Sequence, residues 1–173
     1  SNIESGEMDY VFETVDIQEL VKGVIDEVRP NIEKTHLKFT FSHDGHKKYL
    51  AHVDKGKIRQ VISNLIDNAL KYTQKGMVKV RLSSEQKEDV IRVAIVDTGI
   101  GMDQNTLDKL FKKFSRAEGI SKMHTEGSGL GLYVARQILR KHSGRIWAES
   151  EGKGKGSQFY VEMNAVKSEP KPE

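Results

Sequence analysis

Two amide side chains one helical turn apart are the first residues of this sequence that could do chemistry. Residues 64–72 read NLIDNALKY, and helical spacing places Asn64, Asn68 and Lys71 together, opposite a broad apolar face. Asn is a poor helix former because its side chain competes for the backbone, so two of them suggest a role for their oxygens. A neutral oxygen suits Mg²⁺, which keeps most of its waters and bridges phosphates, and Lys71 can reach the same phosphates. The alternative is a solvated amphipathic helix.

A single carboxylate at the end of an apolar run is the second candidate. Asp97 follows VIRVAIV and opens the sequence DTGIGM, which contains Gly99 and Gly101. A carboxylate at the end of a buried strand is partly desolvated and needs hydrogen-bond donors. The two glycines leave space for a flat ring to approach the backbone, and an adenine amine would supply a donor. The alternative is a turn-capping Asp-Thr-Gly, which occurs in any class of protein.

A glycine-rich helix start is the third candidate. Residues 127–132 read GSGLGL and place Gly127, Gly129, Leu130, Gly131 and Leu132 where a helix begins. Exposed N–H groups and the helix dipole at such a start bind phosphate, although a helix start without any ligand is the alternative. A P-loop would need Gly-Lys-Ser/Thr, and a dinucleotide-binding fingerprint would need a preceding strand, whereas the residues before this segment are polar.

In this order, the three motifs resemble the catalytic ATP-binding domain of sensor histidine kinases, in the GHKL superfamily of ATPases and kinases. The resemblance covers nearly all of the chain from about Phe12 to about Ala165. It implies ATP and Mg²⁺ as cofactors, with Asn68 as the direct metal ligand and Asn64 as its neighbour. It also implies that Asp97 reads the exocyclic amine of adenine.

Further positions fit the same family pattern. Tyr72 is expected to cover the nucleotide, and the hydroxyl of Ser157, within a GxGS-x-F element that ends at Phe159, to help hold adenine through water. Phe111 and Phe114 resemble the phenylalanine box that anchors a lid over ATP. The predicted nucleotide ligands are Asn64, Asn68, Lys71, Tyr72, Asp97, Gly99, Gly101, Gly127, Gly129, Leu130, Gly131, Leu132 and Ser157.

Two positions bear on the type of reaction. Arg116 lies in the predicted lid at 116–128, and its guanidinium suits the charge of a γ-phosphate during transfer. In the family members that hydrolyse ATP, a Glu that activates water stands where this chain has Asn64. An amide cannot act as a base at neutral pH, which favours phosphate transfer over hydrolysis. We therefore predict Asn64, Lys71 and Arg116 as catalytic residues.

The phosphate acceptor is missing from this sequence. None of the six histidines stands in the HExxxP-like context that histidine kinases phosphorylate, and His142 in KHSGRIW is expected to be structural. The chain therefore resembles the catalytic half of a kinase, with the parent's dimerisation and phosphoacceptor domain and a response regulator receiver domain as partners. The open alternatives are a nucleotide-sensing module without transfer activity, an anti-sigma-type serine kinase and, disfavoured by Asn64, a hydrolase of the same superfamily.

The composition fits this interpretation. The chain has 173 residues, 36% hydrophobic and 31% charged, which is typical of one globular domain with a full core. The net charge of +3 is small and predicts no nucleic-acid partner. The absence of cysteine excludes a disulfide scaffold and fits the cytoplasm. There is no signal peptide and no apolar run of the roughly 20 residues that a membrane helix needs. Any membrane spans of a parent protein are therefore expected outside this chain. We expect the isolated domain to be monomeric.

The predicted fold is an α/β two-layer sandwich, in which a mixed, mostly antiparallel sheet packs against three helices. The helices are expected near Asp16–Glu33, Lys55–Tyr72 and Gly129–His142. The strands are expected at 11–15, 37–42, 49–53, 78–84, 90–96, 144–150 and 157–162. We expect residues 1–11 to end a preceding helical domain, compatible with a cloning remnant at the start, residues 12–165 to form the catalytic domain, and residues 166–173 to be a disordered tail.

Overall fold

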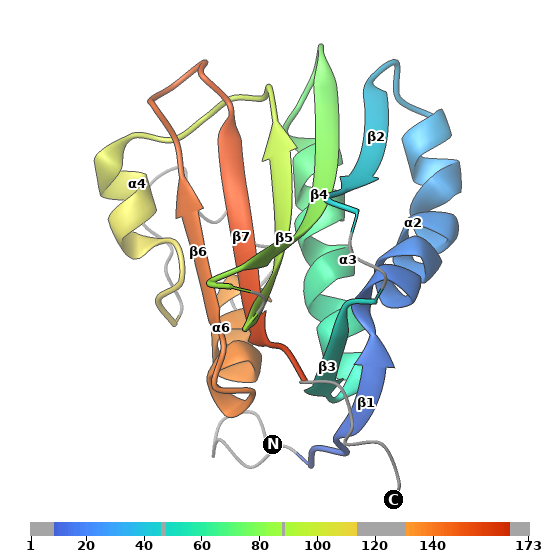
Figure 1. Ribbon diagram of the computed structural model, residues 1–173. Helices are drawn as coiled ribbons and strands as arrows, with labels where there is room; N and C mark the ends of the chain where they lie inside the picture. Colours follow the sequence, from blue (N-terminus) through green and yellow to red (C-terminus); the bar gives the residue numbers. More distant parts are fainter. Residues whose placement is uncertain (1–8, 46–47, 88, 114–130, 167–173) are drawn as a thin grey trace, which may run out of the picture.

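The computed structural model describes residues 9–45, 48–87, 89–113 and 131–166. Figure 1 shows two layers, with a five-stranded sheet on one side and helices α2, α3 and α6 on the other. The elements are β1 (Glu13–Asp16), α2 (Ile17–Glu33), β2 (Lys38–His43), β3 (Leu50–Val53), α3 (Lys55–Lys71), β4 (Met77–Glu85), β5 (Val90–Asp97), α4 (Gln104–Lys109), α6 (Gly131–Lys141), β6 (Arg145–Glu149) and β7 (Ser157–Asn164).

Aspartates begin three of the helices. Asp16, Asp54 and Asp103 stand at the N-caps of α2, α3 and α4, and each side chain accepts a hydrogen bond from a backbone N–H of the first turn. An N-cap acceptor satisfies one of the donors that a helix start leaves free, which stabilises the helix by about 1 kcal/mol. The predicted starts of the helices near residues 16 and 54 are thus confirmed.

The main sheet is mixed, as predicted. Its strand order is β2-β4-β5-β7-β6, with β2 and β4 parallel and the other pairs antiparallel. The apolar faces of α2, α3 and α6 pack on one side of this sheet and form one continuous core with it. Phe159 on β7 is buried in this core and Trp147 lies on β6, so both are residues of the sheet.

Strands β2 and β3, which are neighbours along the chain, belong to different sheets. β2 is an edge strand of the main sheet, whereas β3 pairs with β1 in a separate two-stranded sheet that places Val15 opposite Ala51. The periodicity of the sequence therefore located both strands but could not show their partners.

Among the helices of the described residues, none combines the length and the apolar character that a membrane span needs.

One histidine joins the two helices that carry the candidate site. His142 follows α6, and its Nδ1 contacts the Ile138 carbonyl oxygen at 2.7 Å while its Nε2 accepts from the Asp54 backbone N–H at 2.9 Å. Since Asp54 is the N-cap of α3, this contact fixes the end of α6 to the start of α3. Burial is the main cause that lowers the pKa of His142, which keeps the ring neutral at pH 7. This position is structural, as the sequence predicted.

Candidate functional site

The carboxylate of Asp97 lies where three elements meet. Asp97 ends β5, is paired in register with Ser157 at the start of β7, and lies beside the residues that follow α3. Its Oδ1 accepts the backbone N–H of Gly99 at 2.8 Å and that of Ser157 at 3.2 Å. No donor from the described residues reaches Oδ2, so one oxygen of a largely buried carboxylate is left to accept from a ligand.

The glycine after Asp97 allows this close packing. A Cβ at Gly99 would lie 2.3 Å from the Tyr72 carbonyl oxygen, 2.8 Å from Thr73 Oγ1 and 3.0 Å from Asp97 Oδ1. The backbone N–H of Ile100 donates to the same Tyr72 oxygen at 3.1 Å. The turn is therefore held directly against the end of α3, in a space that any side chain would fill.

Two buried hydroxyls lie beside Asp97 without a hydrogen-bond partner among the described residues. They are Thr73 Oγ1 and Ser157 Oγ, in residues that are 4% and 1% exposed. Buried polar groups without partners are uncommon, and each one indicates that a water, an ion or a ligand binds there. We call Thr73, Asp97, Gly99 and Ser157 the base site, because they gather buried polar atoms around one carboxylate.

Burial sets the charge behaviour of Asp97. Desolvation is the largest influence and raises the pKa of the carboxyl, while the two backbone donors at Gly99 and Ser157 oppose the rise. Keeping Asp97 ionised therefore costs free energy in the unbound protein, and a further hydrogen-bond donor would stabilise the charged carboxylate. The exocyclic amine of an adenine ring is such a donor.

The stripe of amides on α3 lies partly inside the molecule. Asn68 is only 3% exposed, and Asn64 is half-buried, so the predicted alternative of a solvated face does not hold for these two residues. A Cβ at Gly131 would lie 3.2 Å from Asn64 Nδ2. The structure thus brings the asparagine motif and the glycine-rich helix start together, although 66 residues of sequence separate Asn64 from Gly131.

The remaining predicted ligands in the described residues differ in what they can offer. The exposed Lys71 places its Nζ 5.5 Å from the centre of the Tyr72 ring. Leu132 is fully buried in the core, so it offers a ligand at most its backbone. Gly101 has φ +65°, and a Cβ there would lie 2.1 Å from the Gly152 carbonyl oxygen. Backbone conformation and packing therefore require glycine at this position, whether or not a ligand binds.

Several predicted residues lie outside the described part of the chain. They are Phe114, Arg116, Gly127, Gly129 and Leu130. Their roles in the lid and in the phosphate-binding helix start therefore stay predictions from the sequence.

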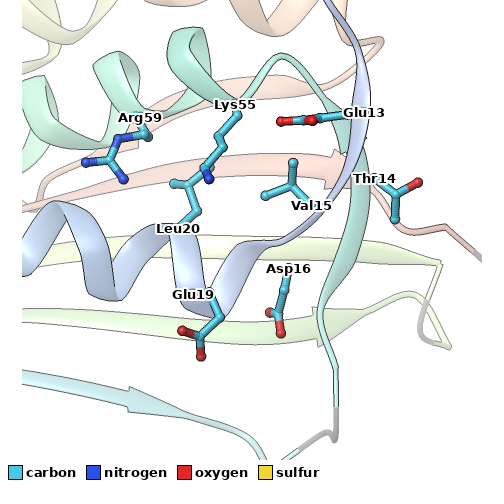
Figure 2. Close-up of a pocket in the computed structure, with 8 residues that line it drawn as sticks. All are labelled: Glu13, Thr14, Val15, Asp16, Glu19, Leu20, Lys55 and Arg59. Atoms are coloured by element: carbon cyan, nitrogen blue, oxygen red, sulfur yellow. The ribbon is translucent and has the colours of Figure 1, made fainter.

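A cavity elsewhere in the molecule contains none of the predicted site residues. It measures 310 Å³ and lies where β1 and the first turn of α2 meet the first turns of α3 (Figure 2). Its lining includes Lys55 and Arg59 from α3, Glu13 from β1 and Glu19 from α2. Because Asn64 to Lys71 and the base site lie toward the other end of α3, this cavity is no part of the candidate site.

Sequence reasoning missed Thr73. It follows directly after NLIDNALKY, and neither its type nor its spacing marks it as a ligand. Only the fold shows that its hydroxyl lies beside Asp97, 24 residues further along the chain.

The site agrees with a comparison of the chain with known protein families. Residues 53–167 match the sequence model of the "Histidine kinase-, DNA gyrase B-, and HSP90-like ATPase" family. This chain belongs to that ATPase family. The matched range contains every residue of the base site, the stripe on α3 and the glycine-rich start of α6.

Relatives within this ATPase family are named as sensor kinases. The chain is 33% identical over 150 residues to the sensor histidine kinase WalK of Bacillus subtilis, covering 84% of this chain and 24% of that protein. It is 36% identical over 150 residues to the adaptive-response sensory kinase SasA of Thermosynechococcus vestitus, covering 86% and 38%. The chain thus spans well under half the length of these two relatives.

Solved structures show the same fold. The catalytic domain of the histidine kinase ThkA superposes with a TM-score of 0.77 at 26% identity, covering 91% of this chain and 99% of that one. The predicted GHKL fold and the resemblance to histidine kinase catalytic domains are therefore confirmed.

The residues present fit the ATP that members of this family use. The base site offers the adenine amine a carboxylate oxygen, Asp97 Oδ2, that no donor from the described residues reaches. No group of three or more His, Cys, Asp or Glu able to hold a metal occurs in the described residues. A Mg²⁺ ion bound through amide oxygens, phosphates and water needs no such group, so Asn64 and Asn68 fit this ion.

Proposed function

We propose that this chain is the ATP-binding catalytic domain of a sensor histidine kinase, which transfers the γ-phosphate of ATP to a histidine on a separate phosphoacceptor domain. The observation that carries the proposal is the base site around Asp97, inside a range that matches the ATPase family. Relatives named as sensor histidine kinases over most of this chain support the kinase class.

The ligand roles follow from the geometry around the base site. Asp97 Oδ2 accepts from the adenine amine, while Gly99 packs against the Tyr72 carbonyl oxygen and donates its backbone N–H to the other oxygen of the carboxylate. Ser157, whose backbone N–H donates to Asp97 Oδ1, supplies a buried hydroxyl beside the carboxylate. Tyr72 and Lys71 then extend from the end of α3 toward the ribose and phosphates.

The metal and the phosphates belong to the α3 stripe and the start of α6. Asn68 would be the direct Mg²⁺ ligand, and Asn64, whose Nδ2 would lie 3.2 Å from a Cβ at Gly131, would stand beside it near the start of α6. Bound there, Mg²⁺ would neutralise charge on the phosphate oxygens. Lys71 and, from the lid, Arg116 add positive charge where the transferred group leaves ADP.

Position 64 favours transfer over hydrolysis. The side chain of Asn64 is an amide, its Nδ2 faces Gly131, and it cannot take a proton from water at neutral pH. A nucleophile must therefore come from another molecule, and a histidine side chain needs no base because its neutral nitrogen carries a lone pair. The relatives' names favour histidine over the serine that an anti-sigma-type kinase would phosphorylate.

The partners follow from the missing acceptor. We propose that the parent's dimerisation and phosphoacceptor domain receives the phosphate and that a response regulator receiver domain takes it from there, on the cytoplasmic side of any membrane that the parent spans. The chain itself carries six histidines in no acceptor context.

The test mixes this chain with the parent's phosphoacceptor domain and labelled Mg-ATP. We expect label on the acceptor domain only, and we expect acid to remove it because phosphohistidine is acid-labile. The Asp97→Asn variant, in which we expect adenine binding to be weakened, serves as the control. Label that survives acid would favour a serine kinase, whereas ATP binding without any label on a competent acceptor would favour the sensing module. Stoichiometric label on one of this chain's own histidines would contradict the proposal.

A further inference from the structure

The hydroxyl of Ser150 spends its full hydrogen-bonding capacity on the backbone of three other residues. Ser150 follows β6, and its Oγ donates to the Gly156 carbonyl oxygen at 2.7 Å, closer than the Gly152 carbonyl oxygen at 3.3 Å. The same Oγ accepts from the backbone N–H of Met102 at 3.0 Å and from that of Gly152 at 3.3 Å. A serine hydroxyl has one hydrogen and two lone pairs, so these contacts satisfy it completely. The proposed function gives Ser150 no role.

These residues belong to two irregular segments that pack against each other. Met102 ends the turn that follows β5, whereas Gly152 and Gly156 lie in the connection between β6 and β7, which passes beside that turn (Figure 1). The backbone N–H of Gly156 also donates to the Gly99 carbonyl oxygen at 3.1 Å. Ser150 therefore joins the far end of the turn to both ends of the connection.

The two donors to the carboxylate of Asp97 come from these same segments. The backbone N–H of Gly99 lies in the turn, and that of Ser157 follows Gly156 directly. They donate to Asp97 Oδ1 at 2.8 and 3.2 Å. Where these donors hold Oδ1 decides where Oδ2 points. Ser150 can therefore influence the carboxylate through the backbone of the two segments.

Other side chains at this junction differ in how firmly they hold it. The side chain of Met102 is 1% exposed and fixes the end of the turn in the core. Lys153 in the connection pairs with Asp103 after the turn at 3.7 Å, but these side chains are 74% and 46% exposed, and such an ion pair contributes little. The half-buried hydroxyl of Ser150 is thus a firmer link between the segments than this ion pair.

We propose that Ser150 is a positioning residue of the nucleotide site, which holds the turn at 97–102 and the β6–β7 connection together before the nucleotide arrives. The inference rests on the proposed binding of ATP at Asp97. A turn that is already held loses little conformational entropy when a ligand binds, whereas a loose turn must be ordered, which lowers affinity. Every adenine ligand therefore gains the same factor from Ser150, whatever phosphates it carries.

Titration calorimetry on Ser150→Ala measures this factor. We expect ATP, ADP and adenosine each to bind about 5- to 10-fold more weakly than to the wild type, the effect of about one hydrogen bond. The ratio of the ATP affinities with and without Mg²⁺ should stay within about twofold of the wild-type ratio, because the proposed metal ligands lie on α3. Unchanged affinities, or a loss that differs between adenosine and ATP, would overturn the inference.

Two control variants separate positioning from a general loss of packing. Ser150→Thr keeps the hydroxyl and should bind all three ligands within about twofold of the wild type. Ser83→Ala removes another buried serine hydroxyl, which donates to Glu85 near the far end of β4 from the base site, and should leave the three affinities unchanged. Weakened binding in Ser150→Thr as strong as that in Ser150→Ala would contradict a role of the hydroxyl.

A double-mutant cycle with Asp97→Asn shows whether Ser150 acts through the carboxylate. The combined loss of ATP affinity should be clearly smaller than the product of the two single losses, because no charged acceptor is left to position. Independent losses would overturn the inference. A wild type that does not bind ATP would overturn the proposed function as well, whereas a wild type that binds ATP but transfers no phosphate to a competent acceptor domain would contradict the proposed function alone.

Hydrogen exchange on the nucleotide-free wild type tests the same inference without a variant, should Ser150→Ala not fold. The backbone N–H of Met102 donates to Ser150 Oγ, so it should exchange at least about 100-fold more slowly than in an unstructured peptide. Mg-ATP should slow it no more than it slows the core amides of β5. Exchange at the rate of an unstructured peptide, followed by strong protection when ATP binds, would show that the nucleotide itself orders the turn and would overturn the inference.

Discussion

Asp97→Asn is the most informative single substitution in this chain. The amide oxygen of Asn can still accept from the backbone N–H groups of Gly99 and Ser157, which now donate at 2.8 and 3.2 Å. The other half of the side chain changes from a free acceptor to an NH₂ donor that faces the adenine amine. Losing a hydrogen bond to a charged group and leaving two donors face to face costs about 2–3 kcal/mol, or roughly 30- to 150-fold in affinity.

The fold should survive this substitution. Burial raises the pKa of Asp97, so the ionised carboxylate is held at a cost that a neutral amide does not bear. We expect the free energy of unfolding at neutral pH to change by no more than about 1 kcal/mol. Asp16→Asn is the matched control, because it makes the same chemical change at the N-cap of α2, where Asn caps as well as Asp.

Titration calorimetry with ATP, ADP and GTP measures the effect. Asp97→Asn should weaken ATP and ADP equally, since both carry the same ring, and the wild type should bind GTP poorly. The wild type should also lose ATP affinity as the pH falls toward the raised pKa of Asp97, because protonation removes the free acceptor, and the variant should lack this component. Equal affinity of the wild type for ATP and GTP, or an Asp97→Asn variant that binds ATP normally, would refute the reasoning.

Four further predictions concern the metal ligands, the reaction and the histidine that joins α6 to α3. Asn68→Ala should abolish the Mg²⁺-dependent tightening of ATP binding but keep adenosine binding, and an unchanged rate of phosphate transfer would refute the metal assignment. Asn64→Glu should lower the rate of phosphate transfer and reveal slow ATP hydrolysis in a phosphate-release assay. Arg116→Ala should slow transfer in single-turnover experiments and leave ADP affinity within about twofold, because its charge matters as the γ-phosphate leaves. The lowered pKa of His142 means that its contribution to stability is present above about pH 6.5 and is lost as the pH falls below that value. Urea unfolding at pH 7.5 and 5.5 should therefore show a smaller loss for His142→Gln than for the wild type, and equal losses would contradict a neutral, buried ring.

The elements of this fold could be predicted because their signals are local. The apolar face of α3 repeats with the period of a helix, and Asp54 marks its start with a side chain that caps the first turn. The alternation and apolar content of residues 90–97 marked β5 in the same way. The pairing of strands is not local, which is why the neighbours β2 and β3 were located correctly although their membership of different sheets was invisible.

By itself, the sequence determined the family and supplied the residues that we propose as nucleotide ligands, because Asn64, Asn68, Asp97 and the glycines stand in motifs whose order carries the resemblance. The tertiary structure alone decided which atoms face one another. It brought Gly131 beside Asn64 and joined Asp54 to His142, and among the described residues it left the hydroxyls of Thr73 and Ser157 beside Asp97 without a partner. Burial and hydrogen-bond satisfaction depend on atoms contributed by distant segments, so no local pattern could have singled out Thr73.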